Sequence, residues 1–510
     1  MNRKEFIKKT GLAAAGAFVA PYILPSGRLF ASTGGTALVD HVVLVMMAGG
    51  IRHQDSIQQL YLKGSQYSSY TGPSGDLPKL DIKGNVMYNL LEGQSPVYNK
   101  TVSTNNSDYN AAGKIFYGPS GSGDSHIDPI FQQGNTLQTQ GIFYKKIKSS
   151  SPGHYTGLNV LLQGNTLLSQ GLKQRPLYPT IFEYARKYRG LKATDTWFVG
   201  YGIGNSIPLL SYSQHPNWGA KYGANFLVPD VIFGNKKSLT TPLGEKYLKD
   251  AKIYHPDEYA NLYGLKNFLD NTFEQVGVTY TDIGNTEQEK HDIKQFMQNM
   301  FGASYNNIRF PLIHNGSATV RDPQGNIIGG SYQSVDTTAV GYAIEVMDKF
   351  KPKLTVVNMH AVDGAHQNYP SYLQNLHVAD HSVAHLWKYI QSTPGFQDNT
   401  IMIIVPECGR NLQPNAIKDI NNLLGYDHSD LNTQDVFAMI LGPQNSTAWT
   451  QGPSLGHMVD YSTSNNNQTA DIVPTIAHAM GFLTDLQQEH QQNSFLYNTP
   501  VSLLSTQKLT

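Results

Sequence analysis

A carboxylate and an imidazole lie three residues apart in the segment "NMHAVDGAHQNY", at Asp363 and His366. This segment follows the apolar run at 354–359, which has the length and composition of a buried strand. Carboxylate and imidazole side chains together are typical ligands of zinc and similar divalent ions. The pattern predicts a metal-binding loop after this strand, and the alternative is a pair of solvated loop residues.

The segment "PECGRNLQPN" places a second carboxylate, Glu407, at the end of the apolar run at 400–406. Arg410 follows three residues later, and a guanidinium group suits a tetrahedral oxyanion because it offers two parallel N–H donors. The alternative is an internal ion pair between Glu407 and Arg410 that holds the loop. Cys408 lacks an identifiable base that could activate it, so we expect a buried, unreactive thiol.

Two further loops carry groups that could complete such a site. In "KSSSPGHYTGLN", three serines, with Ser150 in the middle, precede a proline and a predicted helix. A hydroxyl there would face the positive end of a helix dipole, which is a suitable place to meet phosphate or sulfate, although a plain N-cap is the alternative. His457 lies in the glycine-flanked segment "GPSLGHMVDYS", after the apolar run at 436–443.

Three other histidines, His377, His381 and His385, recur every four residues on a predicted helix. This spacing puts neighbouring side chains on one helix face, as in helical zinc sites. No carboxylate stands where such a site has its general base, because Asp380 lies off this face. We therefore favour a polar helix face that borders the cleft over a metal site.

The composition limits the class of protein. Among the 510 residues, Lys+Arg and Asp+Glu are both 38, so the chain lacks the basic surface that a nucleic-acid partner requires. Charged residues make up 15%, against about 25% in an average domain, which suits an exported protein. The single cysteine excludes intramolecular disulfides.

The N-terminus predicts export. Basic residues precede an apolar run from Gly11 to Ala20, which is too short to span a membrane. The segment "NRKEFIKKTG" resembles a twin-arginine signal with Lys4 in place of the second arginine, so the general secretory route is equally open. We expect a signal peptide at 1–31, a mature chain without a transmembrane segment, and a location in the periplasm, at the cell surface or outside the cell.

Strand-like and helix-like segments alternate over much of the chain. This alternation predicts an α/β fold, with a mostly parallel central sheet and helices on both faces. We expect one domain at 32–510, with a loop-rich insertion at about 57–135 and a cap at about 203–335. The predicted strands are 42–46, 141–147, 196–202, 354–359, 400–406 and 436–443, and the predicted helices are 153–164, 178–188, about 243–275, 286–301, 337–350, 371–391 and 470–481.

The first of these strands ends without a ligand. In an open α/β sheet, ligands bind beyond the carboxyl ends of the strands. The strand that begins at Val42 runs into Ala48, Gly49 and Gly50, where a metal-binding carboxylate would be expected. We expect the two glycines to let the backbone approach the cleft.

The order of these segments resembles the alkaline phosphatase/sulfatase superfamily, which includes nucleotide pyrophosphatases/phosphodiesterases. "SSPGHYTG" is similar to the phosphodiesterase nucleophile loop, "VDGAH" stands in the metal-loop position, and "IMIIVPECGR" stands at the family's Asp-His-Gly strand end. "GH" at 456–457 and "TADIVPTIAHAMG" are similar to the family's last ligand loop and final helix. The Glu-x-Gly-Arg-Asn form, with "GYDH" further on, is most similar to a poorly characterised exported branch.

The resemblance implies a serine nucleophile at Ser150 and a first metal site at Asp363, His366 and His457. It also implies a second site, but Ala48 and Cys408 stand where the family has ligands, and Glu407 is the one evident anion there. We therefore expect one divalent ion, zinc, or none.

Two functions follow as hypotheses. The first is an exported metal-dependent hydrolase of phosphate, phosphodiester or sulfate esters, in which Arg410 stabilises the oxyanion. The second is a non-catalytic member of the superfamily that serves as a periplasmic or cell-surface binding or structural protein. The expected partner is a small phospho- or sulfo-ester or a cell-surface polymer.

Overall fold

The computed structural model describes the sheet, its helices and the loops at one sheet edge. The described residues are 22–23, 29–30, 35–58, 62–63, 81–82, 87–92, 130–131, 134–166, 175–203, 206–228, 283–302, 319–321, 327–331, 335–366, 369–413, 415–416, 425–443, 449, 458–460 and 466–509. Most of the predicted signal peptide and of the two predicted insertions lies outside these residues, as does His457.

Eight strands form one sheet, which confirms the α/β prediction. Only β13 runs antiparallel to its neighbours, and every other adjacent pair is parallel. The order across the sheet is β14 (Met458–Val459), β6 (Gly141–Lys148), β13 (Asp435–Leu441), β12 (Thr400–Val405), β3 (His41–Met47), β11 (Leu354–Met359), β7 (Thr196–Gly200) and β8 (Asn225–Leu227).

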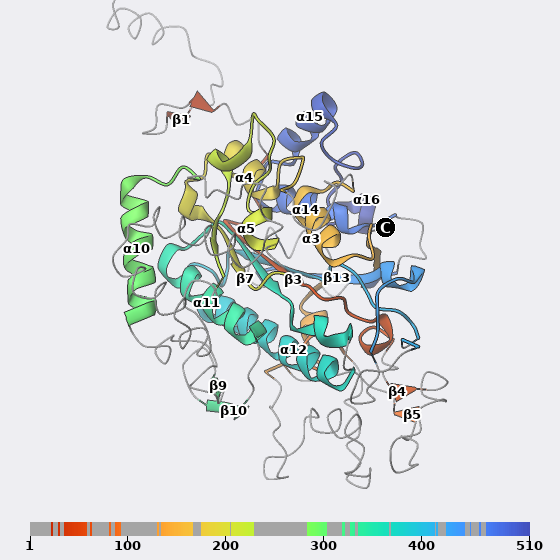
Figure 1. Cartoon of the computed structure of the whole chain (residues 1–510). Coiled ribbons are helices and arrows are strands. Elements are labelled where there is room, and N and C mark those ends of the chain that lie inside the picture. Colours follow the sequence, from red (N-terminus) through yellow and green to blue (C-terminus); the bar gives the residue numbers. More distant parts are fainter. Residues whose placement is uncertain are drawn as a thin grey trace, which may run out of the picture.

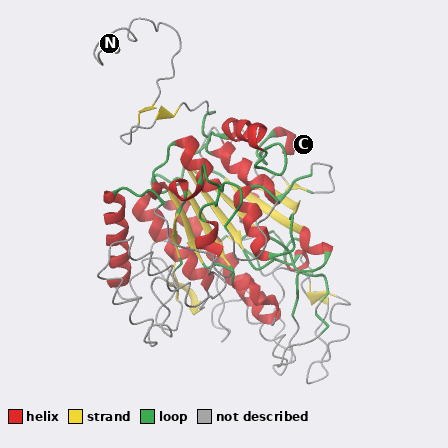
Figure 2. Cartoon of the chain, turned by 45° about the horizontal axis from the view of Figure 1, so that its top comes forward, coloured by secondary structure: helices red, strands yellow, loops and turns green. Residues whose placement is uncertain are grey.

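Helices cover both faces of this sheet, as predicted (Figures 1 and 2). On one side lie α11 (Val335–Phe350) and α12 (Tyr369–Ser392). On the other side lie α3 (His154–Gln163), α4 (Ile181–Arg189), α5 (Ser206–Leu210) and α14 (Ile472–Ala479). The remaining described helices are α10 (Glu287–Gly302), α15 (Leu483–Asn493) and α16 (Thr506–Leu509).

Shorter elements complete the described chain. Three two-stranded antiparallel pairs are β1 (Tyr22–Ile23) with β2 (Leu29–Phe30), β4 (Leu62–Lys63) with β5 (Asp81–Ile82), and β9 (Thr319–Arg321) with β10 (Ile327–Ser331). The 3-10 helices are η1 (His53–Asp55), η3 (Leu137–Thr139), η4 (Ala193–Asp195), η5 (Gly219–Tyr222), η7 (Ala361–His366), η8 (Leu431–Gln434) and η9 (Thr469–Asp471).

The local sequence explains where the elements begin and end. Every residue of β3 is buried, because both sheet faces are covered, and this requires the unbroken apolar run. Helix α4 begins at Ile181, three residues later than predicted, because Thr180 and Glu183 form a capping box. Helix α3 ends at Gln163, and Gly164 caps it with a φ of 67°, the left-handed conformation that glycine adopts without strain.

The parallel strands deliver their loops to a common edge. Met47 of β3 pairs with Met359 of β11, and Val405 of β12 pairs with Met46, so these three strands end side by side. The loops that begin at Ala48, His360 and Pro406 therefore leave the sheet together. At this edge lie Asp363, His366, Glu407 and Arg410 among the predicted site residues.

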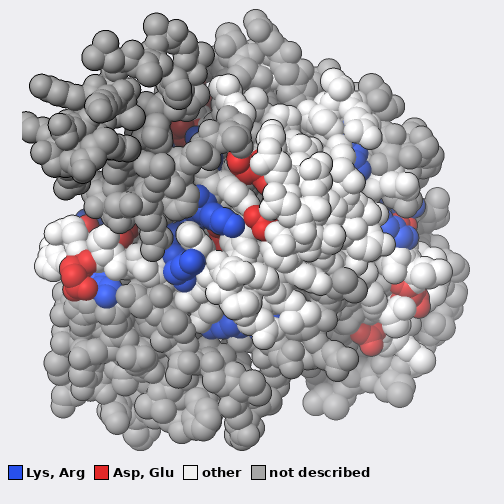
Figure 3. Space-filling model, turned by 90° about the horizontal axis from the view of Figure 1, so that it is seen from above, with Lys and Arg blue, Asp and Glu red and all other residues white. Residues whose placement is uncertain are grey.

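The described surface carries few charges. In the view of Figure 3, most described atoms belong to uncharged residues, with small groups of basic and acidic side chains among them. Among the described helices, none combines the length and apolarity needed to cross a membrane.

Candidate functional site

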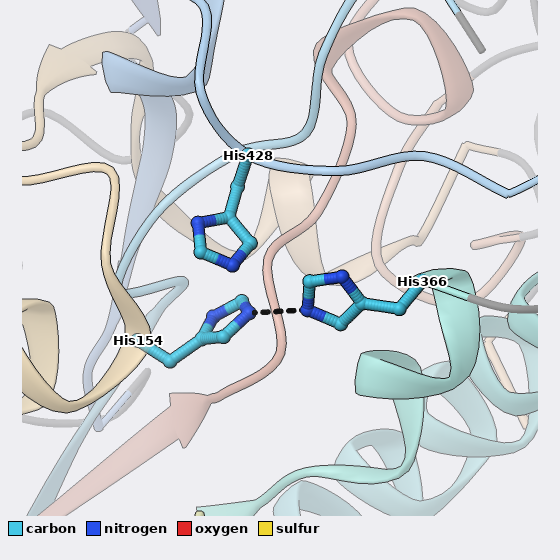
Figure 4. Close-up of side chains that lie close together, drawn as sticks. All are labelled: His154, His366 and His428. Atoms are coloured by element: carbon cyan, nitrogen blue, oxygen red, sulfur yellow. Dashed lines mark hydrogen bonds between the residues drawn. The ribbon is translucent and has the colours of Figure 1, made fainter. Parts of the chain in front are cut away.

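His154 lies at the centre of the polar cluster at this edge. It is the first residue of α3, and its side chain is buried. Its Nε2 lies 3.0 Å from Oδ1 of Asp363 and 3.3 Å from Nε2 of His366 (Figure 4). The same Asp363 oxygen lies 3.2 Å from Nε2 of His366. Three ligand atoms from two separate loops thus form a nearly equilateral triangle.

These separations fit one divalent ion. A tetrahedral zinc with ligands at about 2.0–2.1 Å requires ligand atoms that are about 3.3–3.4 Å apart. A third imidazole, His428, lies with its ring centroid 4.2 Å from that of His154 and 4.9 Å from that of His366. One ligand nitrogen from each of these three histidines lies within 4.8 Å of the others. His154, Asp363, His366 and His428 are therefore the residues that would hold the ion.

Glu407 supports His154 from the opposite side of its ring. Its Oε1 lies 2.7 Å from Nδ1 of His154 and accepts a hydrogen bond of 2.6 Å from the backbone N–H of Gly49. Because a carboxylate only accepts, the His154 ring donates from Nδ1 to Glu407 and from Nε2 to Asp363, and an ion at Nε2 would replace the proton there. A histidine that is oriented by a carboxylate in this way is typical of metal ligands. Glu407 thus has the contacts of an orienting group.

Arg410 pairs with Asp363 and not with Glu407. Its Nη2 donates to Oδ1 of Asp363 at 2.8 Å and also contacts the carbonyl of Gly49. Its Nε donates to the same Gly49 carbonyl at 2.8 Å, and its Nη1 donates to the carbonyl of Tyr426 at 2.9 Å. The guanidinium is fully buried, and these bonds fix it beside the triangle.

The charges of the cluster shift its pKa values strongly. Burial opposes protonation of His154, but hydrogen bonds to Asp363, Cys408 and Glu407 raise its pKa to about 12. Burial opposes ionisation of Asp363, but hydrogen bonds from His154 and His366 hold its pKa well below the usual range. Burial and the nearby positive charges of His154 and Arg410 lower the pKa of His428 to about 4. A metal ion at Nε2 therefore competes with a tightly held proton on His154.

Glycines allow the loops of the site to touch. Gly49 has φ of 109°, and a Cβ there would lie 2.4 Å from the backbone nitrogen of Asp363. A Cβ at Gly50 would lie 2.7 Å from the carbonyl oxygen of Gly409. Both contacts are too short for a side chain, which confirms the prediction that these glycines let the backbone approach the site. The strand tip contributes close packing, and Ala48 contributes no ligand.

The three serines before α3 have different roles. Ser149 donates its hydroxyl to the carbonyl of Glu407 at 2.7 Å and to that of Ser151 at 2.9 Å. The Ser151 hydroxyl accepts the N–H of Gly153 at 3.0 Å. The Ser150 Oγ is buried and has no hydrogen-bond partner among the described residues. Ser149 and Ser151 hold the loop, and Ser150 keeps a hydroxyl that the loop does not use.

The predicted site is thus partly assembled. Asp363, His366 and Arg410 meet directly, and Glu407 joins them through His154. His457 lies outside the described residues. The sequence reasoning missed His154 and His428 as site residues, although both stand in the quoted segments "SSPGHYTG" and "GYDH".

The histidine row on α12 does not border the site as an exposed polar face. His377, His381 and His385 are at most 1% exposed, so this prediction is wrong. The reason is that α11 packs on α12 and the segment around Asn89 covers it, with the Asn89 N–H donating to Asp380 at 3.0 Å. Burial lowers the pKa of His381 well below the usual value, so its imidazole is neutral.

Cys408 is a buried thiol, as predicted. Burial and the charge of Glu407 raise its pKa to about 11. Its Sγ lies 3.4 Å from Nδ1 of His154. The thiol therefore faces the side of the imidazole that Glu407 occupies.

No protein-family model matches the chain, and no curated protein matches it in sequence. Solved structures do match the chain. A protein in the alkaline phosphatase superfamily from Vibrio parahaemolyticus is 9% identical, with a TM-score of 0.34, over 94% of this chain and 76% of that one. The phosphonate monoester hydrolase of Agrobacterium radiobacter is 10% identical, with a TM-score of 0.35, over 87% of this chain and 74% of that one.

The alkaline phosphatase of the Antarctic bacterium TAB5 is 12% identical, with a TM-score of 0.31, over 88% of this chain and 99% of that one. At such identities and TM-scores, the chemistry of this chain has to be inferred from its own side chains. The names of two of these structures, a protein in the alkaline phosphatase superfamily and an alkaline phosphatase, belong to the superfamily that the sequence motifs resemble.

Proposed function

We propose that the protein hydrolyses phosphate, phosphodiester or sulfate esters with the help of one divalent ion, zinc. The observation that carries this proposal is the triangle of Nε2 of His154, Nε2 of His366 and Oδ1 of Asp363, with sides of 3.0–3.3 Å. Nitrogen and oxygen atoms at these separations are a suitable donor set for zinc. The ion, when bound, would stabilise negative charge on an ester oxygen.

The protein's own groups have separate tasks in this proposal. Glu407 holds the His154 proton on Nδ1, so an ion at Nε2 would replace only the proton that Nε2 donates to Asp363. Most N–H groups of Arg410 donate to Asp363 and to two backbone carbonyls. Arg410 therefore positions Asp363 and adds positive charge near the bound ester anion. Both groups are buried, so their charges act with little screening.

Ser150 is the proposed nucleophile, because its buried hydroxyl is the one in its loop that has no partner among the described residues. Its Oγ would form a bond to phosphorus or sulfur while the ester oxygen–phosphorus or –sulfur bond breaks. The serine proton would leave with the departing alcohol. Water would then hydrolyse the serine ester and restore the hydroxyl.

The test uses aryl phosphate, aryl phosphodiester and aryl sulfate substrates with metal-free and zinc-loaded protein. We expect turnover only with zinc, and a loss of at least about a thousandfold in Ser150→Ala with zinc binding unchanged. Ser151→Ala is the matched control, because Ser151 only accepts a backbone N–H, and it should stay within about tenfold of wild type. Full turnover by Ser150→Ala would exclude the serine mechanism.

One observation favours the non-catalytic alternative. Without an ion, the charges of Asp363 and Glu407 are already balanced by Arg410 and by a strongly basic His154. A protein that uses the fold only for binding would not need a metal ion to balance these charges. Metal analysis of the purified chain separates the two functions, because the alternative requires no bound ion and no turnover of any of the three substrates.

We also propose that the chain is exported through a signal peptide at residues 1–31 and acts on a small ester or a cell-surface polymer in the periplasm or outside the cell. The basic start, the short apolar run and the low content of charged residues support this proposal. Cell fractionation and the N-terminal sequence of the mature protein test it. A full-length chain in the cytoplasm would contradict it.

A further inference from the structure

The two nitrogens of the His154 ring face two different donor sets. In Figure 4, one ring nitrogen points to His366 and the other is turned away from it. On the second side, Nδ1 lies 2.7 Å from Oε1 of Glu407 and 3.4 Å from Sγ of Cys408. That sulfur lies 3.7 Å from the same Glu407 oxygen. Nitrogen, oxygen and sulfur thus converge at a second point, of which the proposed ester hydrolysis uses only the hydrogen bond between Nδ1 and Glu407.

The second carboxylate oxygen gives independent evidence for a ligand. Glu407 is fully buried, and its Oε2 has no hydrogen-bond partner among the described residues. A buried carboxylate oxygen without a partner is costly, and a cation would satisfy it. One ligand atom each from His154, Glu407 and Cys408 lies within 4.8 Å of the others.

We propose that Nδ1 of His154, Glu407 and Sγ of Cys408 form a binding site for one thiophilic divalent cation, such as Cd²⁺ or Zn²⁺. A tetrahedral ion with about 2.3 Å to sulfur and about 2.0 Å to nitrogen requires these two atoms to be about 3.5 Å apart. The observed distance of 3.4 Å satisfies this requirement, whereas the 2.7 Å between Nδ1 and Oε1 of Glu407 is a hydrogen-bond distance that must lengthen by about 0.6 Å when an ion replaces the proton. Thiolate and carboxylate together neutralise the ion, and the thiolate selects soft cations over Mg²⁺ and Ca²⁺.

Occupation of this site excludes an ion on the other side of the ring. A neutral imidazole carries one proton, and it sits on the nitrogen that does not bind metal. An ion at this site displaces the Nδ1 proton and the Cys408 thiol proton to solvent and leaves the proton on Nε2, which Oδ1 of Asp363, 3.0 Å away, accepts. An ion at Nε2 leaves the proton on Nδ1, where Glu407 accepts it. The chain therefore holds one ion at a time, and a thiophilic cation displaces the ion that the proposed hydrolysis requires.

The experiment titrates Cd²⁺ into the full, metal-free chain and follows the thiolate-to-metal charge-transfer absorption. Cys408 is the one cysteine of the sequence, so this absorption reports Cys408 alone. We expect saturation at one equivalent in wild type and in His366→Ala, and no such absorption in Cys408→Ser. Glu407→Gln should weaken Cd²⁺ binding about 10–100-fold, because the site loses its carboxylate charge. Circular dichroism establishes that each variant is folded.

The outcomes separate this inference from the proposed function. Cd²⁺ bound to wild type without the absorption, or two equivalents bound at saturation, would overturn the thiol site or its exclusivity. Equal loss of the absorption in His366→Ala would also overturn it, because His366 belongs to the other donor set. Zinc binding that survives in Cys408→Ser and is lost in the double variant Cys408→Ser/His366→Ala supports the hydrolytic site. If Cys408→Ser binds no zinc while wild type shows the absorption, the thiol site stands and the proposed function falls.

Discussion

The contact between Gly49 and the Asp363 loop gives a quantitative prediction for Gly49→Ala. Gly49 has φ of 109°, and an added Cβ would lie 2.4 Å from the nitrogen of Asp363, where ordinary contacts begin at 3.4 Å. The backbone conformation alone costs an alanine about 1–3 kcal/mol. Relief of the overlap requires a loop shift of about 1 Å, and overpacking of this kind adds about 1–3 kcal/mol.

Gly395→Ala is the matched control. Gly395 has φ of 91°, but an added Cβ would meet nothing within 4 Å, so this variant carries only the backbone cost. Urea unfolding should therefore show Gly49→Ala about 1–3 kcal/mol less stable than Gly395→Ala. A chelator competition should show weaker zinc binding in Gly49→Ala alone, because the shift moves Asp363. Equal stability and equal zinc affinity in the two variants would refute the argument that this contact positions the site.

Two further variants test groups away from the ligands. Glu183 is fully buried and accepts five hydrogen bonds, from the backbone and hydroxyl groups of Thr180 and Ser213 and from the Gly219 N–H. In Glu183→Gln, the new NH₂ group must face one of these donors. The free energy of unfolding in urea should therefore fall by about 2–4 kcal/mol. A loss below about 0.5 kcal/mol would contradict that account. Burial raises the pKa of Asp336 to about 7 from 3.8, even though its carboxylate accepts the N–H groups of His360 and Ala361. Between pH 3.8 and about 7, Asp336 is thus protonated in the folded chain and ionised in the unfolded chain. The free energy of unfolding should therefore fall as the pH rises toward 7. Asp336→Asn should flatten this dependence in urea midpoints measured from pH 4 to 8, and an unchanged slope would show that another group titrates.

The fold was predictable because buried strands and helices appear in the sequence as local patterns of apolar residues. The strand at 354–359 has the predicted bounds, since both its faces are covered and every residue must be apolar or paired. The predicted strand at 196–202 ends two residues earlier, at Gly200, where φ is 127° and the chain turns away. Such end points depend on backbone geometry that apolar patterns do not record.

The partners within the site were less predictable, because they depend on contacts between distant segments. The sequence left open an ion pair between Arg410 and Glu407, three residues away, but Arg410 pairs with Asp363 across 47 positions. His154 reaches Glu407 because α3 packs closely on that loop at Gly157, where a Cβ would lie 2.7 Å from the Glu407 carbonyl oxygen. The sequence shows a glycine there but does not show what it lies against. Asp363 and His366 were predicted as metal ligands because a carboxylate and an imidazole three residues apart can be recognised in the sequence itself.

The place of β3 in the sheet also governs the order in which the chain can fold. Its two neighbours, β11 and β12, lie far along the chain, and His41 at its start contacts the Pro352 carbonyl across 311 positions. Pairing over such distances is slow, because a long segment must be closed into a loop before any hydrogen bond forms. During synthesis, this buried strand emerges early, and its two neighbours are complete only after residues 359 and 405 have been made. A ribosome that stalls before Leu354 thus releases a strand with two open edges, which is the kind of segment that aggregates.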